Sequence, residues 1–183
     1  MSKFVLIDGH SILNRAFYGV PIFTNSEGLH TNAVFGFLNI MFKIIDSKQP
    51  DYMAVAFDVH QPTFRHEMFK DYKGTRKPMM EELREQVPVI KELLQKMNIT
   101  TVELPGYEAD DVIGTLSKKG EKAGMEVDVI SGDRDLLQLA SDHITICIPK
   151  TKKGQTTVEE YNTEGVRRLY KVTPTEFIDV KAL

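Results

Sequence analysis

Two groups of carboxylates have a spacing that could bind metal ions. Glu108, Asp110 and Asp111 belong to the stretch LPGYEADDVIG, and Asp133 and Asp135 belong to SGDRDLLQL. The first group opens a helical pattern after a Pro-Gly pair, and the second follows an apolar run typical of a buried strand. Carboxylates gathered at such junctions repel one another unless a cation neutralises them. The spacing therefore predicts a divalent metal site.

Two more aspartates follow apolar runs that are typical of strands. Asp8 comes directly after Lys3–Ile7 (KFVLI), and Asp58 comes directly after Tyr52–Phe57 (YMAVAF). Either aspartate alone would be read first as a helix cap or a surface residue. Because sites in open α/β sheets form outside the carboxyl ends of the strands, we expect both aspartates to join the two acidic groups in one pocket.

Helical spacing indicates which carboxylates of the first group share a face. Glu108 and Asp111 are three residues apart and lie on one face of a helix, whereas Asp110 is turned away from Asp111 by about 100°. We therefore expect Asp8, Glu108, Asp111 and Asp133 to line one acidic pocket.

The ligand types indicate a hard cation. The candidate ligands are all carboxylates, and neither the single cysteine nor the histidines occur at metal-ligand spacing. Oxygen ligands favour Mg²⁺ or Mn²⁺ over Zn²⁺. Seven acids are too many for one Mg²⁺, whereas two ions roughly 3.5 to 4 Å apart would use them and would suit phosphodiester hydrolysis.

A basic segment, residues 65–77 (RHEMFKDYKGTRK), follows the second predicted strand. It interleaves basic and aromatic residues, namely Arg65, Phe69, Lys70, Tyr72, Lys73, Arg76 and Lys77. Its periodicity is weak and its like charges oppose burial, so we expect it to be mobile in the absence of a ligand. Phosphate attraction and base stacking would suit a nucleic-acid strand, and the plainer alternative is a solvated loop.

The remaining pattern alternates strands with helices, which predicts an α/β domain with a mostly parallel central sheet flanked by helices. Further strands are expected over residues 100–104, 127–131 and 144–148, with an edge strand over 156–161. Helices are expected over residues 11–18, 31–47, 78–97, 107–124, 134–140, 163–170 and 175–183.

Length and composition fit one soluble globular domain. The chain has 183 residues, of which 42% are hydrophobic and 27% charged. Its net charge of -3 does not indicate a nucleic-acid binder overall, although bases concentrate in the basic segment. No signal peptide is visible, the longest apolar stretch is too short to span a bilayer, and one cysteine fits a reducing compartment. We therefore expect a cytoplasmic monomer without membrane contact.

Several motifs together resemble a known family. DGHSILNRAFY, AFD, FRHEMFKDYKGTRKPM, LPGYEADDVIGTL and SGDRDLLQL resemble, in the family's order, the 5′-nuclease domain of bacterial DNA polymerase I. That domain belongs to the flap-endonuclease-like superfamily, which is related to PIN domains. The resemblance covers essentially the whole of residues 1–183. It implies a metal-dependent 5′-3′ deoxyribonuclease that degrades DNA 5′ ends and cuts 5′ flaps in repair and Okazaki-fragment processing.

The resemblance also implies roles by position. The metal-site acids of the family match Asp8, Asp58, Glu108, Asp110, Asp111, Asp133 and Asp135. The arch segment of the family, which contacts the scissile phosphate and threads or clamps a 5′ single strand, matches about residues 62–80. Within that segment, Lys73 and Arg76 would be catalytic. DNA would be bound by Arg65, Lys70, Tyr72, Lys73, Arg76 and Lys77.

The family continues with two further aspartates and a helix-hairpin-helix, followed by polymerase domains, whereas this sequence ends at Leu183. We therefore expect a fragment that binds one metal ion tightly and cleaves more slowly than a longer version.

Two other classes of protein stay open. A haloacid-dehalogenase-like phosphatase would require Asp-x-Asp after the first strand, where this chain has Asp8-Gly9-His10. A non-catalytic DNA-binding module would not need so many acids beside a phosphate path, because they repel DNA.

Overall fold

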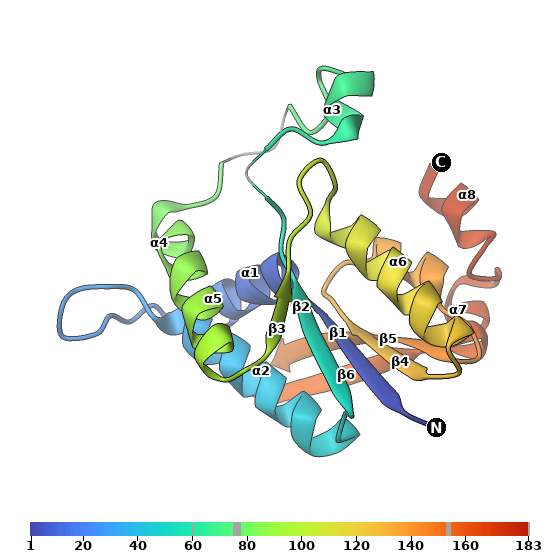
Figure 1. Ribbon diagram of the computed structural model, residues 1–183, viewed down its shortest axis with the longest axis horizontal. Coiled ribbons are helices and arrows are strands. Elements are labelled where there is room, and N and C mark those ends of the chain that lie inside the picture. Colours follow the sequence, from blue (N-terminus) through green and yellow to red (C-terminus); the bar gives the residue numbers. More distant parts are fainter. Residues whose placement is uncertain (60, 75–77, 153–154, 183) are drawn as a thin grey trace.

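A six-stranded sheet forms the centre of the computed structural model, which describes residues 1–59, 61–74, 78–152 and 155–182 (Figure 1). The strands are β1 (Lys3–Asp8), β2 (Tyr52–Ala56), β3 (Thr100–Val102), β4 (Glu126–Ile130), β5 (Ile144–Lys152) and β6 (Gln155–Tyr161). Their order across the sheet is β3-β2-β1-β4-β5-β6. The pairs β3-β2, β2-β1, β1-β4 and β4-β5 are parallel, and β5-β6 is antiparallel. The expected mostly parallel sheet with a late edge strand is confirmed.

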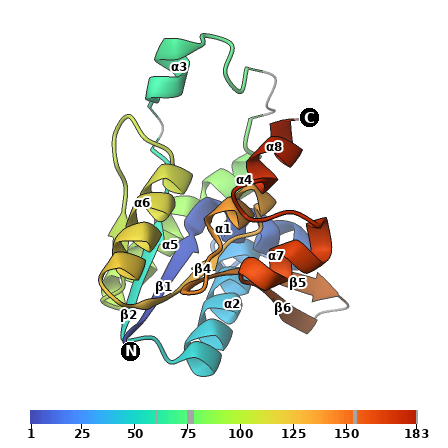
Figure 2. The same cartoon turned by 90° about the vertical axis from the view of Figure 1, so that its right-hand side faces the viewer.

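Helices cover both faces of this sheet (Figures 1 and 2). One face packs against α1 (Gly9–Gly19), α2 (Asn32–Lys48) and α5 (Gln86–Lys96). The other packs against α6 (Ala109–Lys122), the 3-10 helix η1 (Arg134–Leu139), α7 (Thr163–Tyr170) and α8 (Phe177–Ala182). Because both faces are covered, the ends of the strands are where polar side chains can gather.

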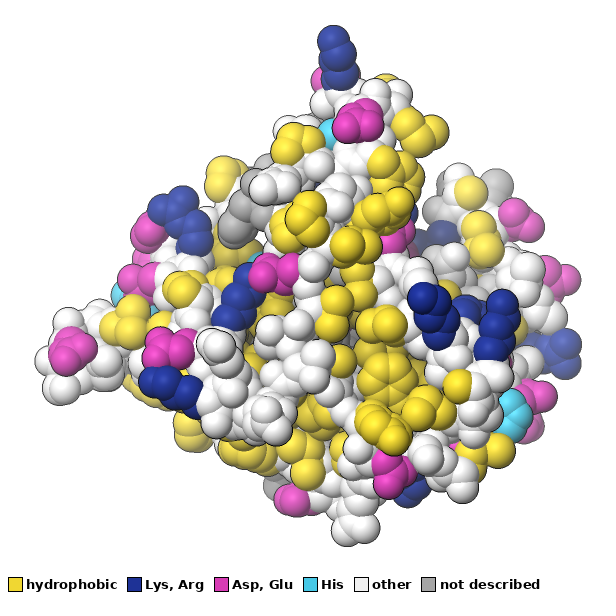
Figure 3. Space-filling view, in the orientation of Figure 1, with side chains coloured by type: hydrophobic (Ala, Val, Ile, Leu, Met, Phe, Trp, Pro, Cys, Tyr) yellow, Lys and Arg dark blue, Asp and Glu magenta, His cyan; other side chains and the backbone are white. Residues whose placement is uncertain are grey.

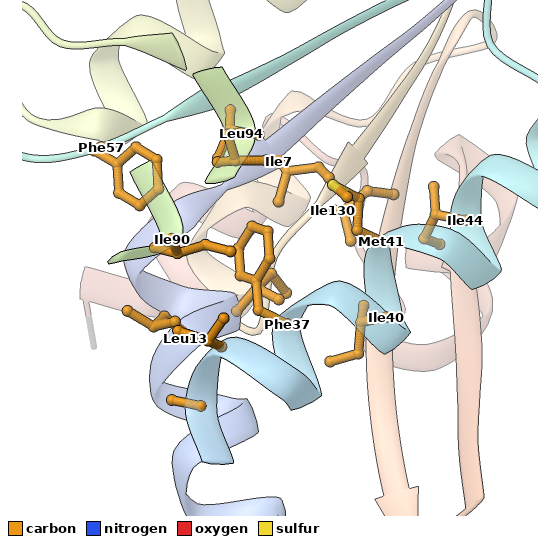
Figure 4. Packing of buried hydrophobic residues seen from close by; sticks show 14 of the residues in the cluster. Ile7, Leu13, Phe37, Ile40, Met41, Ile44, Phe57, Ile90, Leu94 and Ile130 are labelled. Carbon is orange, nitrogen blue, oxygen red and sulfur yellow. The ribbon is translucent and has the colours of Figure 1, made fainter. Parts of the chain in front are cut away.

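The alternation of side chains along β1 divides the core into two parts. Val5 and Ile7 pack with α1, α2 and α5, while Leu6 packs with α6 on the opposite face. This is the two-residue period of a strand that is buried on both sides. Figure 4 shows the first part, in which Phe37 and Met41 of α2 point toward the sheet.

The helices of the first face are tied closely to one another. Gly36 lets α2 approach α1, since a Cβ at that position would lie 2.8 Å from the Cβ of Ala16. Gln86 of α5 is fully buried, and its Oε1 accepts the backbone N–H groups of Ala33 and Val34 at 2.8 and 3.2 Å. The side chain therefore caps the amino end of α2 from a neighbouring helix.

Two predicted helices differ from the observed ones. The long helix predicted over residues 78–97 is divided into α4 (Glu81–Arg84) and α5, with the break at Glu85. Pro88 explains the break, because it has no N–H and its ring would clash with the carbonyl of Arg84 in a continuous α-helix. The helix predicted over residues 134–140 is the 3-10 helix η1, and the strand predicted over 144–148 extends to Lys152.

The stretch of residues 62–74 stands away from the carboxyl ends of the strands (Figure 2). It contains a short helix, α3 (Phe64–Met68), that the weak periodicity of the basic segment does not predict. The backbone N–H of Thr63 donates to Nδ1 of His66 at 3.1 Å, which stabilises the first turn. The mobility of the basic segment stays a prediction. None of the helices in the described part of the chain is long and apolar enough to cross a bilayer.

Candidate metal centre

Asp8 lies at the junction of β1 and α1, where it is buried and fully hydrogen-bonded. The residue is 5% exposed. Oδ1 accepts the backbone N–H of Ser11 at 3.0 Å, so Asp8 is the N-cap of α1. Oδ2 accepts the hydroxyl of Ser131 at 2.8 Å. Burial raises the pKa of Asp8 to about 6, although these two hydrogen bonds act to lower it. Repulsion from Asp58 and Asp133 adds to the increase.

The pairing of β1 with β4 brings Asp133 beside Asp8, as the sequence predicts. Ile7 is in register with Ile130, and Ser131 follows directly. The hydroxyl of Ser131 accepts the backbone N–H of Asp133 at 3.0 Å while it donates to Asp8. One serine therefore holds both acid-bearing junctions together.

Asp58 follows β2 and connects that strand to α6. Its Oδ1 accepts the backbone N–H of Ala109 at 2.7 Å, which satisfies a donor at the amino end of α6. Its Oδ2 lies 3.7 Å from Nδ1 of His10, and its backbone N–H donates to the same nitrogen at 3.2 Å. Asp58 thereby fixes where the first turn of α6 lies relative to the sheet.

Asp110, in that first turn, faces the other three aspartates. Burial is the main cause that raises its pKa to about 7, and repulsion from Asp8, Asp133 and Asp58 follows in that order. We call Asp8, Asp58, Asp110 and Asp133 the aspartate cluster. Asp110 is turned away from Asp111, as the helical spacing predicts, and it is Asp110 that lies with the other three aspartates.

Asp111 and Glu108 face the basic segment instead. The backbone N–H of Glu108 donates to Oδ2 of Asp111 at 3.0 Å, which confirms that the two share a helical face. Arg65 donates two hydrogen bonds to Asp111, at 2.6 and 2.7 Å. This bidentate pair is the main cause that lowers the pKa of Asp111. Asp111 is thus neutralised by a side chain of the same protein, which explains why it does not join the aspartate cluster.

Glu108 forms hydrogen bonds with two further side chains of the basic segment. Nζ of Lys73 lies 2.8 Å from its Oε1, and the hydroxyl of Tyr72 donates to its Oε2 at 3.3 Å. Lys73 adopts a left-handed backbone conformation with φ of 57°. Three of the predicted DNA contacts, Arg65, Tyr72 and Lys73, therefore lie on the acidic first turn of α6.

The remaining predicted site residues lie at the edge of this arrangement or outside it. Asp135 pairs with Lys181 of α8 at 2.7 Å and donates its backbone N–H to Asp133. Lys70 is exposed and makes no ion pair within the part of the chain that the structure describes. Arg76 and Lys77 lie outside the described residues, so their predicted roles stay predictions.

Sequence reasoning missed the residues that connect the acidic junctions. Ser11 follows Asp8 by three residues, the spacing of a capped helix, and its Oγ accepts the backbone N–H of Gly132 at 2.8 Å. That spacing could have identified Ser11, whereas nothing local identifies Ser131. Arg15 lies near Gly132, and its Nε is buried without a hydrogen-bond partner among the described residues.

A family model and several known proteins match most of this chain. A family model described as "5′-3′ exonuclease, N-terminal resolvase-like domain" matches residues 3–171. DNA polymerase I of Bacillus caldotenax is 51% identical over 181 residues, which cover 99% of this chain and 20% of that protein. DNA polymerase I of Bacillus subtilis (strain 168) gives the same identity and coverage. The chain thus spans about a fifth of the length of these curated relatives.

A solved structure of the bacteriophage T5 flap endonuclease has the same fold. That structure is described as a pseudo-enzyme–product complex with DNA and metal ions. The TM-score is 0.74 at 23% identity, and the match covers 98% of this chain and 65% of the phage protein. The mostly parallel sheet with the helices that flank it is therefore shared with a protein of very different sequence.

Proposed function

The chain belongs to the family of 5′-3′ exonuclease N-terminal, resolvase-like domains, and from that membership we propose that it hydrolyses phosphodiester bonds at DNA 5′ ends and 5′ flaps. The observation that carries the proposal is the aspartate cluster at the carboxyl ends of neighbouring strands, with cationic side chains beside it. Carboxylates alone would repel DNA, whereas carboxylates that hold a divalent cation would attract a phosphate.

The donor chemistry of the aspartate cluster fits a hard divalent cation. The pKa values of Asp8 and Asp110 are raised by burial and by neighbouring carboxylates, so a cation among them would relieve the repulsion. Across the described residues, no three Asp, Glu, His or Cys side chains are already close enough to hold one ion directly. Water would therefore complete the coordination, which is the usual arrangement for Mg²⁺.

We propose Mg²⁺ or Mn²⁺ as the metal, with Asp8, Asp110 and Asp133 as its nearest protein groups and Asp58 beside them. Such an ion supplies Lewis-acid stabilisation of phosphate oxygens and lowers the pKa of a bound water. Glu108, Asp111 and Asp135 are paired with cationic side chains. We propose that these three can contribute to a second ion only when those pairs open.

The side chains of the basic segment would hold the scissile phosphate. Lys73 and Arg65 now neutralise Glu108 and Asp111, and an incoming phosphate would compete for the same N–H donors. Charge-assisted hydrogen bonds of this kind orient the phosphate and stabilise charge that develops on its oxygens. Arg76 is proposed to act in the same way.

The relatives indicate the setting of this activity. They are named DNA polymerase I, so we propose that the domain removes 5′ ends and flaps during repair and Okazaki-fragment processing as part of a longer polymerase. DNA with a 5′ flap or 5′ end is the proposed partner.

The test is cleavage of a DNA substrate with a fluorescent 5′ flap, in Mg²⁺, in Mn²⁺ or in EDTA. We expect cleavage by the wild-type protein that requires a divalent ion, and a loss of orders of magnitude in Asp8→Asn. The matched control is Asp142→Asn, which changes an exposed aspartate in the turn before β5. Flap binding without cleavage would indicate a non-catalytic module. Hydrolysis of a phosphate monoester with no cleavage of DNA would indicate a phosphatase.

A further inference from the structure

A groove leaves the aspartate cluster along α6 and carries features that the proposed hydrolysis does not use. This α6 groove encloses about 1110 Å³. Its lining begins at Asp110 and includes the side chains of Phe64, Tyr107, Leu116, Lys119 and Lys122. Its acidic end therefore also carries the two aromatic rings, its middle is apolar beside α6, and its other end is basic.

The basic end follows from the spacing of residues along α6. Asp111, Thr115, Lys119 and Lys122 succeed one another at intervals of three or four residues, so they lie on one stripe of the helix. The 1.5 Å rise per residue places Lys119 about 12 Å along the helix from Asp111. Both lysines are exposed, and neither forms an ion pair with any residue that the structure describes. Cations in a last turn also stabilise a helix, so the lysines alone would not indicate a ligand.

The aromatic residues of the groove indicate a ligand independently of the lysines. Phe64 and Tyr107 are 37% and 47% exposed, and their ring centroids lie 5.6 Å apart. The guanidinium carbon of Arg65 lies 4.6 Å from the centroid of the Phe64 ring, so one face of that ring is already covered. The backbone N–H of Phe64 donates to the carbonyl of Gly106 at 3.0 Å, so α3 is joined to the loop before α6. Figure 3 shows a band of hydrophobic side chains down this side of the molecule, with Lys and Arg side chains to its right. Exposed aromatic rings and exposed cations that line one groove are the combination that binds single-stranded nucleic acid.

We propose that the α6 groove binds the single-stranded 5′ segment of the DNA beyond the aspartate cluster. Bases would stack on Phe64 and Tyr107, and phosphates would lie beside Lys119 and Lys122. A duplex fits less well, because its bases are stacked on one another and offer no free face to an aromatic ring. The proposal rests on the proposed nuclease function and extends it by giving the path of the strand.

The role of the α6 groove in binding the strand can be tested with two double variants. Each removes two positive charges from the last turn of a helix, one in α6 and the other in α7. Lys119→Gln with Lys122→Gln changes two exposed cations in the last turn of α6, and Arg167→Gln with Arg168→Gln does the same in α7. Cleavage is measured on flaps too short to reach the lysines and on longer flaps. We expect wild type to have a lower KM for the longer flaps. The α6 pair should lose that advantage with kcat unchanged, whereas the α7 pair should keep it.

Binding of labelled oligothymidine in EDTA tests the groove without cleavage. Each lost phosphate contact lowers the slope of log K against log salt by about 0.7 for a single strand, so the α6 pair should lower it by about 1.4. Tyr107→Ala should weaken binding roughly tenfold without changing the salt slope, because it removes stacking and no charge.

Three results would overturn the inference while leaving the nuclease proposal intact. They are an α6 pair that keeps the advantage of long flaps, equal losses in both pairs, and a loss that follows the length of the duplex. Failure of the nuclease proposal has a different signature, which is the absence of cleavage by wild type on every substrate. In that case the oligothymidine measurement still decides whether the α6 groove binds a single strand.

Discussion

At the scale of single residues, Asp110 carries a clear electrostatic cost in the metal-free protein. Burial and the neighbouring aspartates raise its pKa from 3.8 to about 7. The folded state therefore binds this proton more tightly than the unfolded state does. The resulting stability is fully present below about pH 4 and is lost as the pH rises through about 7.

Asp110→Asn should remove this dependence. The melting temperature of the metal-free variant should exceed that of wild type by a few degrees at about pH 8 and by much less at about pH 5. The measurement is a series of thermal melts in EDTA, with the exposed Asp142→Asn as the control that should follow wild type. A difference that stays constant with pH would contradict the assignment.

Ser131 is the second residue whose role can be separated from folding. Its hydroxyl donates to Asp8 and accepts from Asp133, so Ser131→Ala should misplace both carboxylates. Loss of such a supporting contact lowers metal affinity by about tenfold or more. The readout is the Mn²⁺ dissociation constant from titration calorimetry.

Ser117→Ala is the matched control for this substitution. Ser117 is also fully buried, but its hydroxyl donates to the carbonyl of Gly114 within α6. The two variants should lose similar stability, and Ser131→Ala alone should lose metal affinity. Equal Mn²⁺ affinity in both variants would show that Ser131 has only a packing role.

At the scale of elements, the basic segment is held against the amino end of α6 by ion pairs. Lys73→Ala should lower flap cleavage by orders of magnitude with the melting temperature nearly unchanged, because the side chain is partly exposed and packs little. Lys70→Ala removes an exposed charge from the same segment and should mainly weaken binding. Single-turnover cleavage with saturating enzyme separates the two effects, and a normal single-turnover rate in Lys73→Ala would refute its catalytic role.

The elements themselves could largely be predicted from the sequence, because hydrophobic period and strand-end position are local properties. The runs KFVLI and YMAVAF gave β1 and β2 with their terminal aspartates in place. The sequence analysis missed the division of the long helix at Glu85. The strong helical periodicity favoured one continuous helix, and only the effect of Pro88 on the preceding turn predicts the break. The orientation of Asp110 and Asp111 was not predictable from helical spacing alone. It depends on Asp58 capping α6 and on Arg65 pairing with Asp111, both of which are tertiary contacts.

At the scale of the whole molecule, metal binding and stability should be coupled. Millimolar Mn²⁺ should raise the melting temperature near neutral pH, because the ion binds only the folded arrangement of the aspartate cluster. At a concentration about 100 times its dissociation constant, the ion adds about 2.7 kcal/mol, or roughly 5 °C or more. Protons compete as Asp8 and Asp110 protonate, so the shift should shrink at about pH 5.

Differential scanning fluorimetry with and without Mn²⁺ measures this coupling. Asp8→Asn is the informative variant, since it should abolish most of the shift. A wild-type melting temperature indifferent to Mn²⁺ at neutral pH would count against a metal in this cluster.

The order of the strands also has a consequence for how the molecule is made. The hydrogen bond between Asp8 and Ser131 spans 123 positions, and it joins the first strand synthesised to one that comes much later. A nascent chain can form β1, β2 and their helices while the place of β4 at the centre of the sheet is still vacant. Contacts between residues so far apart in sequence form late. The chain must lose the conformational entropy of closing the long loop before these contacts can stabilise it. The complete aspartate cluster therefore assembles only after the chain has been synthesised beyond Asp133, and a shorter nascent chain lacks one of its four carboxylates.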